Sequence, residues 1–341
     1  MTDIPAVSVV IPLYNKGPYI ARALNSVLAQ TFQDFEVIVV DDGSTDEGAE
    51  VVRGFDDPRI QLIQQENRGV SAARNRGIEA VRAELVAFLD ADDEWSTEHL
   101  RTLLRLRDSY PEAGAYGTAY LVKEKDSKVH VASFSDDIPQ EPWEGLLPSY
   151  FKAATFGDPP ISASTVAIPI YILKEMDGFS TEEWMGEDVD LWGRIALKYP
   201  ITFSWNSKGI YHTEASNRAC NRVEPLGEAV FVRIAKKAID AGKVSPAMLE
   251  DLREYIALRQ IRRAWGNIHA KRPDIARNLL NNCVTRKFIR KKYWAIFWAC
   301  MPSNVYKSLR STKKIFTETM HKAQKNCLNI FKDRRTYKKT E

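Results

Sequence analysis

Two carboxylates follow an apolar run in the first third of the chain and could hold a metal ion. Asp90 and Asp92 come directly after residues 85–89, an apolar run that predicts a buried strand. In extended backbone, side chains two residues apart lie on the same face, so both could reach one divalent cation or its waters. The alternative is an acidic turn that caps a helix beginning near Ser96.

A second pair of acids, Asp41 and Asp42, ends another strand-like run, residues 35–40, and is followed by Gly43, Ser44 and Thr45. Carboxylate acceptors beside a flexible turn are suited to a ribose or a base edge. The alternative is that the polar residues after the strand only cap the helix expected over residues 47–55.

A third cluster is basic. Arg68, Arg74 and Arg76 lie on or just before a helix that precedes the Asp90 strand. A guanidinium there could pair with a diphosphate or with the neighbouring carboxylates, and purely structural pairing is the alternative.

The third group of acids, at positions 187, 188 and 190, begins a helix expected over residues 189–198. The helix dipole favours a charged carboxylate at this position, and Asp188 could serve as a general base. The alternative is an ordinary acidic helix N-terminus. Further along, His212 could be a metal or phosphate ligand, although it could equally be structural.

The elements that position these residues alternate. Strands are expected at residues 6–13 and 35–40 with a helix over 18–30 between them, which is a right-handed, parallel βαβ unit. Further strands are expected within 116–131, 164–168 and 201–218. Residues 135–160 are expected to form a Pro-rich loop, whose aromatic residues either line a sugar face or belong to a satellite core: Trp143, Tyr150 and Phe151.

Composition limits the class of protein. The 341 residues, 44% of them hydrophobic, can form a sizeable core, and the four widely separated cysteines predict free thiols rather than a zinc site or a disulfide framework. Neither a signal peptide nor a membrane-spanning run is predicted. Residues 282–341 hold 16 Lys and Arg against 3 Asp and Glu, which leaves 32 against 42 for residues 1–281. Such asymmetry predicts an anionic partner for the basic tail.

Several of these segments, in this order and spacing, together resemble the family 2 glycosyltransferases. The segments are Val9-Val10-Ile11-Pro12-Leu13-Tyr14-Asn15, Phe35-Glu36-Val37-Ile38-Val39-Val40-Asp41-Asp42-Gly43-Ser44, Asn67-Arg68-Gly69 with Ala73-Arg74-Asn75, Phe88-Leu89-Asp90-Ala91-Asp92-Asp93, Gly186-Glu187-Asp188-Val189-Asp190-Leu191-Trp192, and Tyr211-His212 with Ser216. The resemblance covers roughly residues 5–218.

The resemblance implies an α/β GT-A nucleotide-binding fold with a mostly parallel central sheet, followed here by a C-terminal helical extension. It implies a metal-dependent, inverting hexosyltransferase that uses Mn²⁺ or Mg²⁺. By resemblance, Asp188 is the catalytic base, and the metal site draws on Asp90, Asp92 and His212. The nucleotide-sugar site that it implies consists of Pro12, Tyr14, Asp41, Asp42, Arg74, Asp90 and Glu187.

The function implied is transfer of a sugar from a nucleotide-sugar, with UDP as the expected nucleotide, to a hydroxyl of a glycan or lipid-linked acceptor in cell-surface polysaccharide biosynthesis. A sugar-nucleotide pyrophosphorylase would need a Gly-rich basic loop that residues 12–17 do not provide. A nucleic-acid-binding protein would leave the acids unexplained. A catalytically degenerate relative, acting as a membrane- or nucleic-acid-binding protein through its basic tail, is the remaining alternative.

We expect three parts: a catalytic domain over residues 1–220, a helical extension over 221–281, and a basic, aromatic-containing tail over 282–341. The extension could shape the acceptor site or mediate homodimerisation. Residues 293–301 are apolar, too short to span a bilayer, and flanked by Lys and Arg, which predicts peripheral docking on the anionic inner face of the cell membrane of a cytoplasmic protein. The alternative is a solvated basic helix with a buried aromatic stripe.

Overall fold

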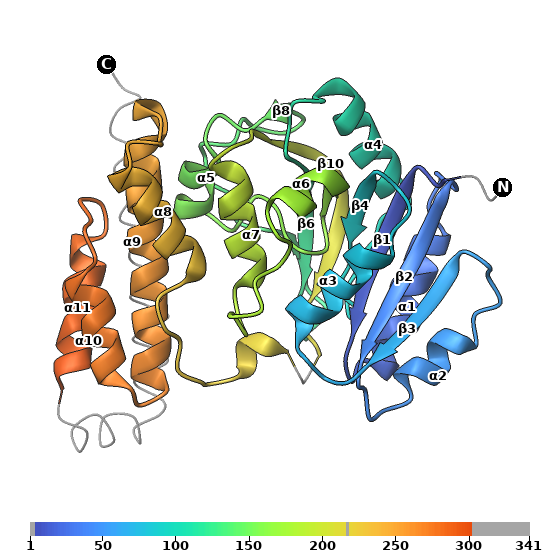
Figure 1. Ribbon diagram of the computed structural model, residues 1–341, viewed down its shortest axis with the longest axis horizontal. Coiled ribbons are helices and arrows are strands. Elements are labelled where there is room, and N and C mark those ends of the chain that lie inside the picture. Colours follow the sequence, from blue (N-terminus) through green and yellow to red (C-terminus); the bar gives the residue numbers. More distant parts are fainter. Residues whose placement is uncertain (1–3, 216–217, 302–341) are drawn as a thin grey trace.

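The computed structural model describes residues 4–215 and 218–301 and has a mixed α/β architecture built on one twisted sheet (Figure 1). The strand order is β3-β2-β1-β4-β9-β6-β10-β5, with β7 paired to β6 and β8 paired to β10. The strands are β1 Val7–Leu13, β2 Phe35–Asp42, β3 Ile60–Gln65, β4 Leu85–Phe88, β5 Glu94–Trp95, β6 Ala115–Lys123, β7 Val129–Val131, β8 Glu144–Leu146, β9 Val166–Pro169 and β10 Ile201–His212.

Strand direction explains where the polar residues gather. β3, β2, β1 and β4 are parallel neighbours, whereas β9 is antiparallel to both β4 and β6. β10 is parallel to β6, so β10 runs in the same direction as β1, β2 and β4. The carboxyl ends of β1, β2, β4 and β10 therefore lie at one edge of the sheet, which we call the carboxyl edge.

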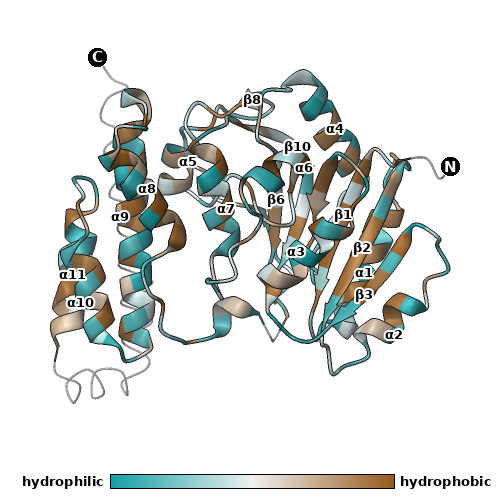
Figure 2. Cartoon of the chain, in the orientation of Figure 1, coloured by the Kyte–Doolittle hydropathy of each residue, from teal (hydrophilic) through white to brown (hydrophobic). Residues whose placement is uncertain are grey.

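Two helical layers cover the two faces of the sheet. Side chains alternate along β1, so Val9 and Val10 belong to two different cores. On the Val9 face pack α1 (Gly17–Leu28), α2 (Gly48–Arg53) and α4 (His99–Ser109). On the Val10 face pack α3 (Val70–Ala80), α5 (Tyr150–Phe156), α6 (Ile170–Glu175) and α7 (Glu187–Ala196). Figure 2 shows the apolar strands enclosed by helices with hydrophilic outer faces.

The chain continues as C-terminal helices at one side of the sheet: α8 Val230–Asp240, α9 Pro246–His269, α10 Pro273–Asn281 and α11 Ile289–Cys300 (Figure 1). The first part of α9 joins the core of the α/β body, and its second part forms a separate core with α10 and α11. Within the described ranges, none of the helices is both long and apolar enough to cross a membrane.

The mostly parallel α/β sheet and the C-terminal helices confirm the fold expected from the sequence, but several local expectations are wrong. Residues 135–160 are not one loop, because they contain β8 and α5. Of the two interpretations of Tyr150 and Phe151, the core one is confirmed, because both side chains are buried. The last strand lies within residues 201–218 as expected and ends at His212, whereas β5 was not expected at all. Ser216 and the basic residues from Lys307 onward lie outside the described residues.

Candidate active site

Arg74 connects two of the acidic segments at the carboxyl edge. It is buried on α3, where Nη2 donates to Asp90 Oδ1 at 2.7 Å and Nη1 donates to Glu187 Oε1 at 2.7 Å. Its guanidinium carbon lies 5.1 Å from the centre of the Phe179 ring. Burial lowers the pKa of Arg74, but Asp90 and Glu187 outweigh burial and leave it raised. One permanent cation therefore joins the end of β4 to the start of α7.

The other two arginines of the expected basic cluster do not share this role. Arg68 is exposed, and the Arg76 side chain pairs with Glu79 one turn further along α3. Of the three arginines, only Arg74 points toward the sheet. Arg74 is therefore the one functional candidate of the cluster.

The first turn of α7 presents two neighbouring carboxylates with different partners. Burial raises the pKa of Glu187 to about 6, and the charge of Asp188 adds to this effect while Arg74 opposes it. Asp188 is half-buried, its Oδ1 accepts from the Val189 N–H at 2.7 Å, and within the described part of the chain it makes no salt bridge. A carboxylate without a cation partner can accept a proton from a bound hydroxyl.

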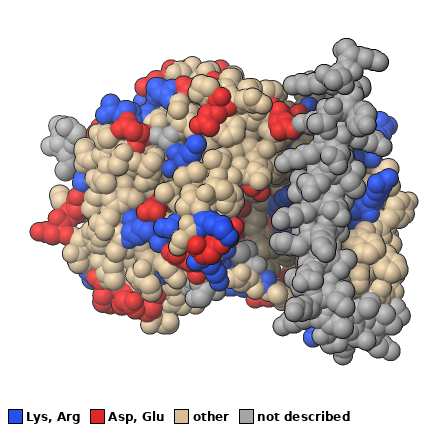
Figure 3. All heavy atoms as spheres, turned by 180° about the vertical axis from the view of Figure 1, so that it is seen from behind, with Lys and Arg blue, Asp and Glu red and all other residues tan. Residues whose placement is uncertain are grey.

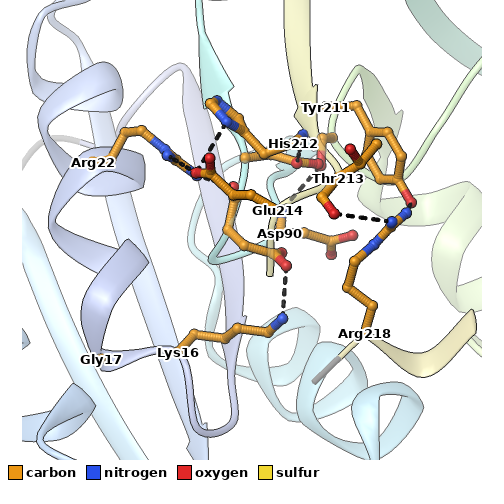
Figure 4. A network of polar contacts seen from close by, with 12 residues as sticks. Lys16, Gly17, Arg22, Asp90, Tyr211, His212, Thr213, Glu214 and Arg218 are labelled. Carbon is orange, nitrogen blue, oxygen red and sulfur yellow. Dashed lines mark hydrogen bonds and ion pairs between the residues drawn. The ribbon is translucent and has the colours of Figure 1, made fainter. Parts of the chain in front are cut away.

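Asp92 is in contact with cationic side chains that follow β1. Lys16 Nζ donates to Asp92 Oδ2 at 2.6 Å, and Arg22 donates to the Asp92 carbonyl oxygen. Arg22 also donates to Glu214 Oε1 at 2.7 Å, beyond β10. Figure 4 shows Lys16, Arg22 and Glu214 in one network of polar contacts beside Asp90. The acidic turn after β4 is thus tied both to α1 and to the segment after β10.

Asp93, the third acid of the turn, is a structural anchor. Its side chain is buried, the Ser164 hydroxyl bonds to Oδ2 at 2.5 Å, and the His212 N–H donates to Oδ1 at 2.9 Å. The Asp90 N–H donates to the same Ser164 hydroxyl at 3.1 Å. Burial, together with the charges of Asp92 and Asp90, raises the pKa of Asp93 well above its usual range. Asp93 therefore fixes the turn and leaves Asp90 and Asp92 at the surface of the edge.

His212 is placed differently from the expected metal ligand. The ring is buried, Nε2 lies 2.9 Å from Glu94 Oε1, and Nδ1 lies 3.5 Å from Glu214 Oε1. Burial lowers the pKa of His212, although Glu94 acts in the opposite direction, so the ring is neutral at pH 7. In the described residues no three His, Cys, Asp or Glu side chains gather as a metal cluster. Asp90, Asp92 and His212 thus do not form a ready-made ligand set, because Arg74, Lys16 and Glu94 already contact them.

Asp41 and Asp42, at the end of β2, form part of the turns around them. Asp41 accepts from the Ser44 N–H at 3.0 Å and from Gln64 Nε2 at 3.0 Å. Asp42 accepts from Gln65 Nε2 at 2.8 Å and from the backbone N–H groups of residues 68 and 69 at 2.9 and 2.8 Å. Both carboxylates are buried. Asp42 in this way fixes the turn that leads into α3 and, through α3, the position of Arg74.

Pro12 and Tyr14 border the same edge from β1. Pro12 is half-buried within the strand, and Tyr14, just beyond it, exposes 37% of its surface. Next in the chain, the Asn15 N–H donates to the Ser44 hydroxyl at 3.0 Å, which ties the end of β1 to the turn after β2. Tyr14 is thereby held beside the Asp41–Asp42 segment with an accessible ring.

Residues 8–165 match the family model described as glycosyl transferase family 2. They form a family 2 glycosyltransferase domain. One relative is similar over most of the chain. The uncharacterised glycosyltransferase alr2836 of Nostoc sp. strain PCC 7120 is 28% identical over 84% of this chain and 82% of its own length. The uncharacterised glycosyltransferase YibD of Escherichia coli K12 is 40% identical over 31% of each chain.

Solved structures share the fold. The S. aureus TarS fragment 1–349 in complex with UDP-GlcNAc superposes with a TM-score of 0.61 at 18% identity, over 92% of both chains. The mannosyltransferase PcManGT from Pyrobaculum calidifontis, in complex with GDP-Man and Mn²⁺, superposes with a TM-score of 0.57 at 19% identity, over 87% of this chain and 86% of that one. The transferase domain therefore has the GT-A-like architecture expected from its sequence.

Sequence reasoning missed four residues that organise the site. Lys16 and Arg22 contact the Asp92 residue, and Asp93 and Ser164 fix its turn. Lys16 could have been noticed, because it is a basic residue directly after the first strand. The pairing of Asp93 with Ser164 spans 71 residues of sequence and leaves no local signal.

Proposed function

We propose that this chain is an inverting glycosyltransferase that moves a sugar from a nucleotide-sugar, with UDP as the nucleotide, to a hydroxyl of a glycan or glycolipid acceptor. The observation that carries the proposal is the placement of Asp188. It follows Glu187, which Arg74 links to Asp90, and it makes no salt bridge with the described residues. A free base therefore stands beside acids suited to the diphosphate end of a donor.

In this proposal Asp188 removes the proton of the acceptor hydroxyl as that oxygen attacks the anomeric carbon. The bond from the anomeric carbon to the diphosphate breaks on the opposite face, so one displacement inverts the centre. A second carboxylate nucleophile is not required, and Glu187 is unsuited to that role because its Oε1 accepts from Arg74. Glu187 instead holds Arg74 in position.

A divalent cation, Mn²⁺ or Mg²⁺, fits the oxygen donors of Asp92 and Asp90, whose side chains remain 15% and 32% exposed. When bound, such an ion neutralises the charge that develops on the diphosphate oxygens. Mg²⁺ is commonly held by one or two carboxylates with substrate phosphates completing its shell, so two aspartates suffice. Lys16 has to release Asp92 Oδ2 or share it, and His212 would have to leave Glu94 to take part.

We assign the nucleotide to the carboxyl ends of β1 and β2, where Pro12 and Tyr14 lie beside the buried Asp41 and Asp42. A carboxylate offers about four acceptor positions, and three on Asp42 are taken by the protein. One position is left for a donor such as the uracil N3–H or a ribose hydroxyl. Tyr14 offers an accessible ring for stacking on the base.

Calorimetric titration tests the donor site. UDP, GDP, dTDP and CMP are titrated into the wild-type chain and into Asp92→Asn, with and without Mn²⁺. We expect manganese-dependent binding of one nucleotide, UDP, with a loss of at least tenfold in affinity in Asp92→Asn. If none of the nucleotides binds the wild type under any condition, the degenerate-relative alternative replaces the transferase proposal.

We further propose that residues 1–220 form the catalytic domain, that residues 221–281 shape its acceptor side, and that the enzyme acts in cell-surface polysaccharide synthesis at the cytoplasmic face of the membrane. In support of the second point, the Tyr255 ring of α9 packs 5.4 Å from Phe151 and 5.6 Å from Phe231.

Homodimerisation through the remaining faces is a proposal that light scattering of the purified chain tests.

The exposed face of α11 supports peripheral membrane docking. Tyr293, Trp294 and Phe297 expose 65%, 50% and 53% of their surfaces, and the last two rings stack 5.5 Å apart. The helix contains Arg290, Lys291 and Lys292 and no acid. Aromatic rings beside Lys and Arg are suited to an anionic lipid interface. By contrast, the other side of α11, including Trp298, is buried in the core with α9 and α10.

Flotation with anionic liposomes tests this docking surface. Replacement of Trp294 and Phe297 by Ser is expected to lower the recovered fraction at least fivefold relative to wild type. Tyr171→Ser is the matched control, because Tyr171 is an exposed aromatic residue on α6 of the α/β body. Equal recovery of wild type and the double variant would remove the proposal.

A further inference from the structure

Helix α9 carries two arginines whose charges are not paired with any of the residues that the structure describes. Arg263 donates to the Gly227 carbonyl oxygen at 2.9 Å and to the buried Glu183. Arg259 and Arg262, one turn apart on the same helix, form neither a hydrogen bond nor an ion pair with any of the described residues. Residues three apart on a helix are neighbours, so the two guanidinium groups share one side of α9.

Arg259, the first of the pair, faces the candidate active site. Tyr255, one turn before Arg259, packs its ring against the α/β body at 5.4 Å from Phe151. Arg259 lies against the start of α7, because a Cβ atom built on Gly186 would come within 2.9 Å of Arg259 Nη2. Gly186 is the N-cap of α7, and Asp188 follows two residues later. Arg259 is therefore a neighbour of the proposed base, and Arg262 lies one turn further along α9.

The pair also lies where a ligand can reach it. Arg259 is half-buried, and Arg262 is exposed to solvent. Desolvation by nearby protein atoms lowers the pKa of Arg262, and the like charge of Arg259 lowers it further, while Tyr255 and Asp158 act in the opposite direction. On the face that Figure 3 shows, Lys or Arg atoms are visible at the margin of a recess beside the α/β body.

Two neighbouring, unpaired guanidinium groups that lose hydration are unfavourable unless an anion binds them. Arginine presents a planar fork of N–H donors that matches the oxygens of a phosphate or a carboxylate. The donor diphosphate already has Asp90, Asp92 and their cation partners as its proposed site. The arginine pair is left for the other substrate.

We propose that Arg259 and Arg262 bind an oxyanion, a phosphate or a carboxylate, carried by the acceptor, and so place a neighbouring acceptor hydroxyl at Asp188. The inference rests on the proposed transferase function and specifies the class of its acceptor: an acidic polyol or glycan rather than a neutral sugar. Arg259 and Arg262 act as positioning residues, because the oxyanion that they hold is not the reacting atom.

Binding of small probes tests the inference without turnover. Inorganic phosphate, glycerol 3-phosphate, glucuronate and glycerol are titrated into the wild type by NMR, with and without saturating UDP and Mg²⁺ to block the donor site. We expect the anions to bind and glycerol not to bind, and the comparison of glycerol 3-phosphate with glucuronate separates phosphate from carboxylate acceptors. Absence of anion binding by the wild type would overturn the inference.

The variants are Arg259→Gln with Arg262→Gln, the corresponding pair of Lys replacements, and Arg253→Gln. Arg253 is the matched control, an exposed arginine on α9 without a partner among the described residues. We expect at least tenfold weaker anion binding in the Gln pair, an intermediate loss in the Lys pair, which keeps the charge but not the fork, and no change in Arg253→Gln.

UDP affinity, measured by calorimetry on the same samples, distinguishes failure of the anion-binding inference from failure of the proposed transferase function. Unchanged UDP binding in the Gln pair supports an acceptor role, whereas its loss would assign the arginines to the donor and overturn the inference. If the wild type binds anions but not UDP, the donor proposal fails and the anion site stands. If it binds UDP but no anion, only the anion site fails.

Discussion

The carboxyl edge and helix α9 differ in whether their charged side chains have partners within the described part of the protein. At the edge, Arg74 contacts Asp90 and Glu187, and Lys16 contacts Asp92, so nearly every charge has a partner within the protein. On α9, Arg259 and Arg262 have no such partner in the described residues. The edge is organised before any ligand arrives, whereas the α9 pair depends on a ligand for its counter-charge.

This difference indicates which charges stabilise the fold and which are kept for binding. Removing one member of a buried ion pair leaves its partner charged and desolvated, which is costly. Removing an unpaired charge that is accessible to solvent leaves no desolvated partner without its counter-charge. Stability measurements should therefore respond strongly at the edge and weakly on α9.

The largest effect on stability is expected from Arg74→Ala. Because Arg74 is buried and contacts two carboxylates, its loss should lower the free energy of unfolding by about 3–5 kcal/mol. Urea denaturation measures the change. Arg76→Ala, on the same helix and in an exposed pair with Glu79, should cost about 0–1 kcal/mol. Equal costs at the two positions would contradict the distinction between buried and exposed pairs.

A smaller effect is expected from pH acting on Glu187. Burial raises its folded pKa from 4.5 to about 6, so between these values the folded state binds more protons than the unfolded state. The contribution of Glu187 to stability is thus present below pH 4.5 and is lost as the pH rises through 6, by about 2 kcal/mol. Urea denaturation of wild type and Glu187→Gln across pH 4–7 measures the difference. Parallel pH curves for the two proteins would rule out this titration.

The smallest effect concerns Lys16, which occupies an oxygen of the proposed metal site. Lys16→Met should strengthen the binding of Mn²⁺ alone several-fold, because a contact worth about 1 kcal/mol no longer competes for Asp92. The free Mn²⁺ signal in electron paramagnetic resonance reports the affinity. Lys125→Met, an exposed lysine in the segment between β6 and β7, is the control. Weaker Mn²⁺ binding in Lys16→Met would show that Lys16 is no competitor.

The fold was largely predictable from the sequence, because β-branched runs and helical spacing are local signals. The runs that became β1, β2 and β4 are continuous and apolar, and the acids that end them are adjacent to them in sequence. Their meeting at one edge follows from parallel pairing alone. The placement of Asp188 at the start of a helix was equally local.

The partners of these acids were not predictable, because they depend on tertiary contacts. Arg74 reaches Glu187 across 113 residues, and although the family resemblance singled out Arg74 among the three arginines, it did not indicate this partner. His212 was expected at a metal, yet its Nε2 faces Glu94, across 118 residues. The pairing of Arg263 with Glu183, and the lack of a partner for Arg259 and Arg262 among the described residues, likewise required the packed structure.

The most direct test of the central claim is the transfer rate of Asp188→Asn, measured with a radiolabelled nucleotide-sugar alongside UDP binding by calorimetry. We expect a rate at least about 10²-fold below wild type, the usual contribution of a general base, with UDP affinity unchanged within twofold. Wild-type transfer by Asp188→Asn would contradict the assignment of Asp188 as the base and, with it, this account of the carboxyl edge.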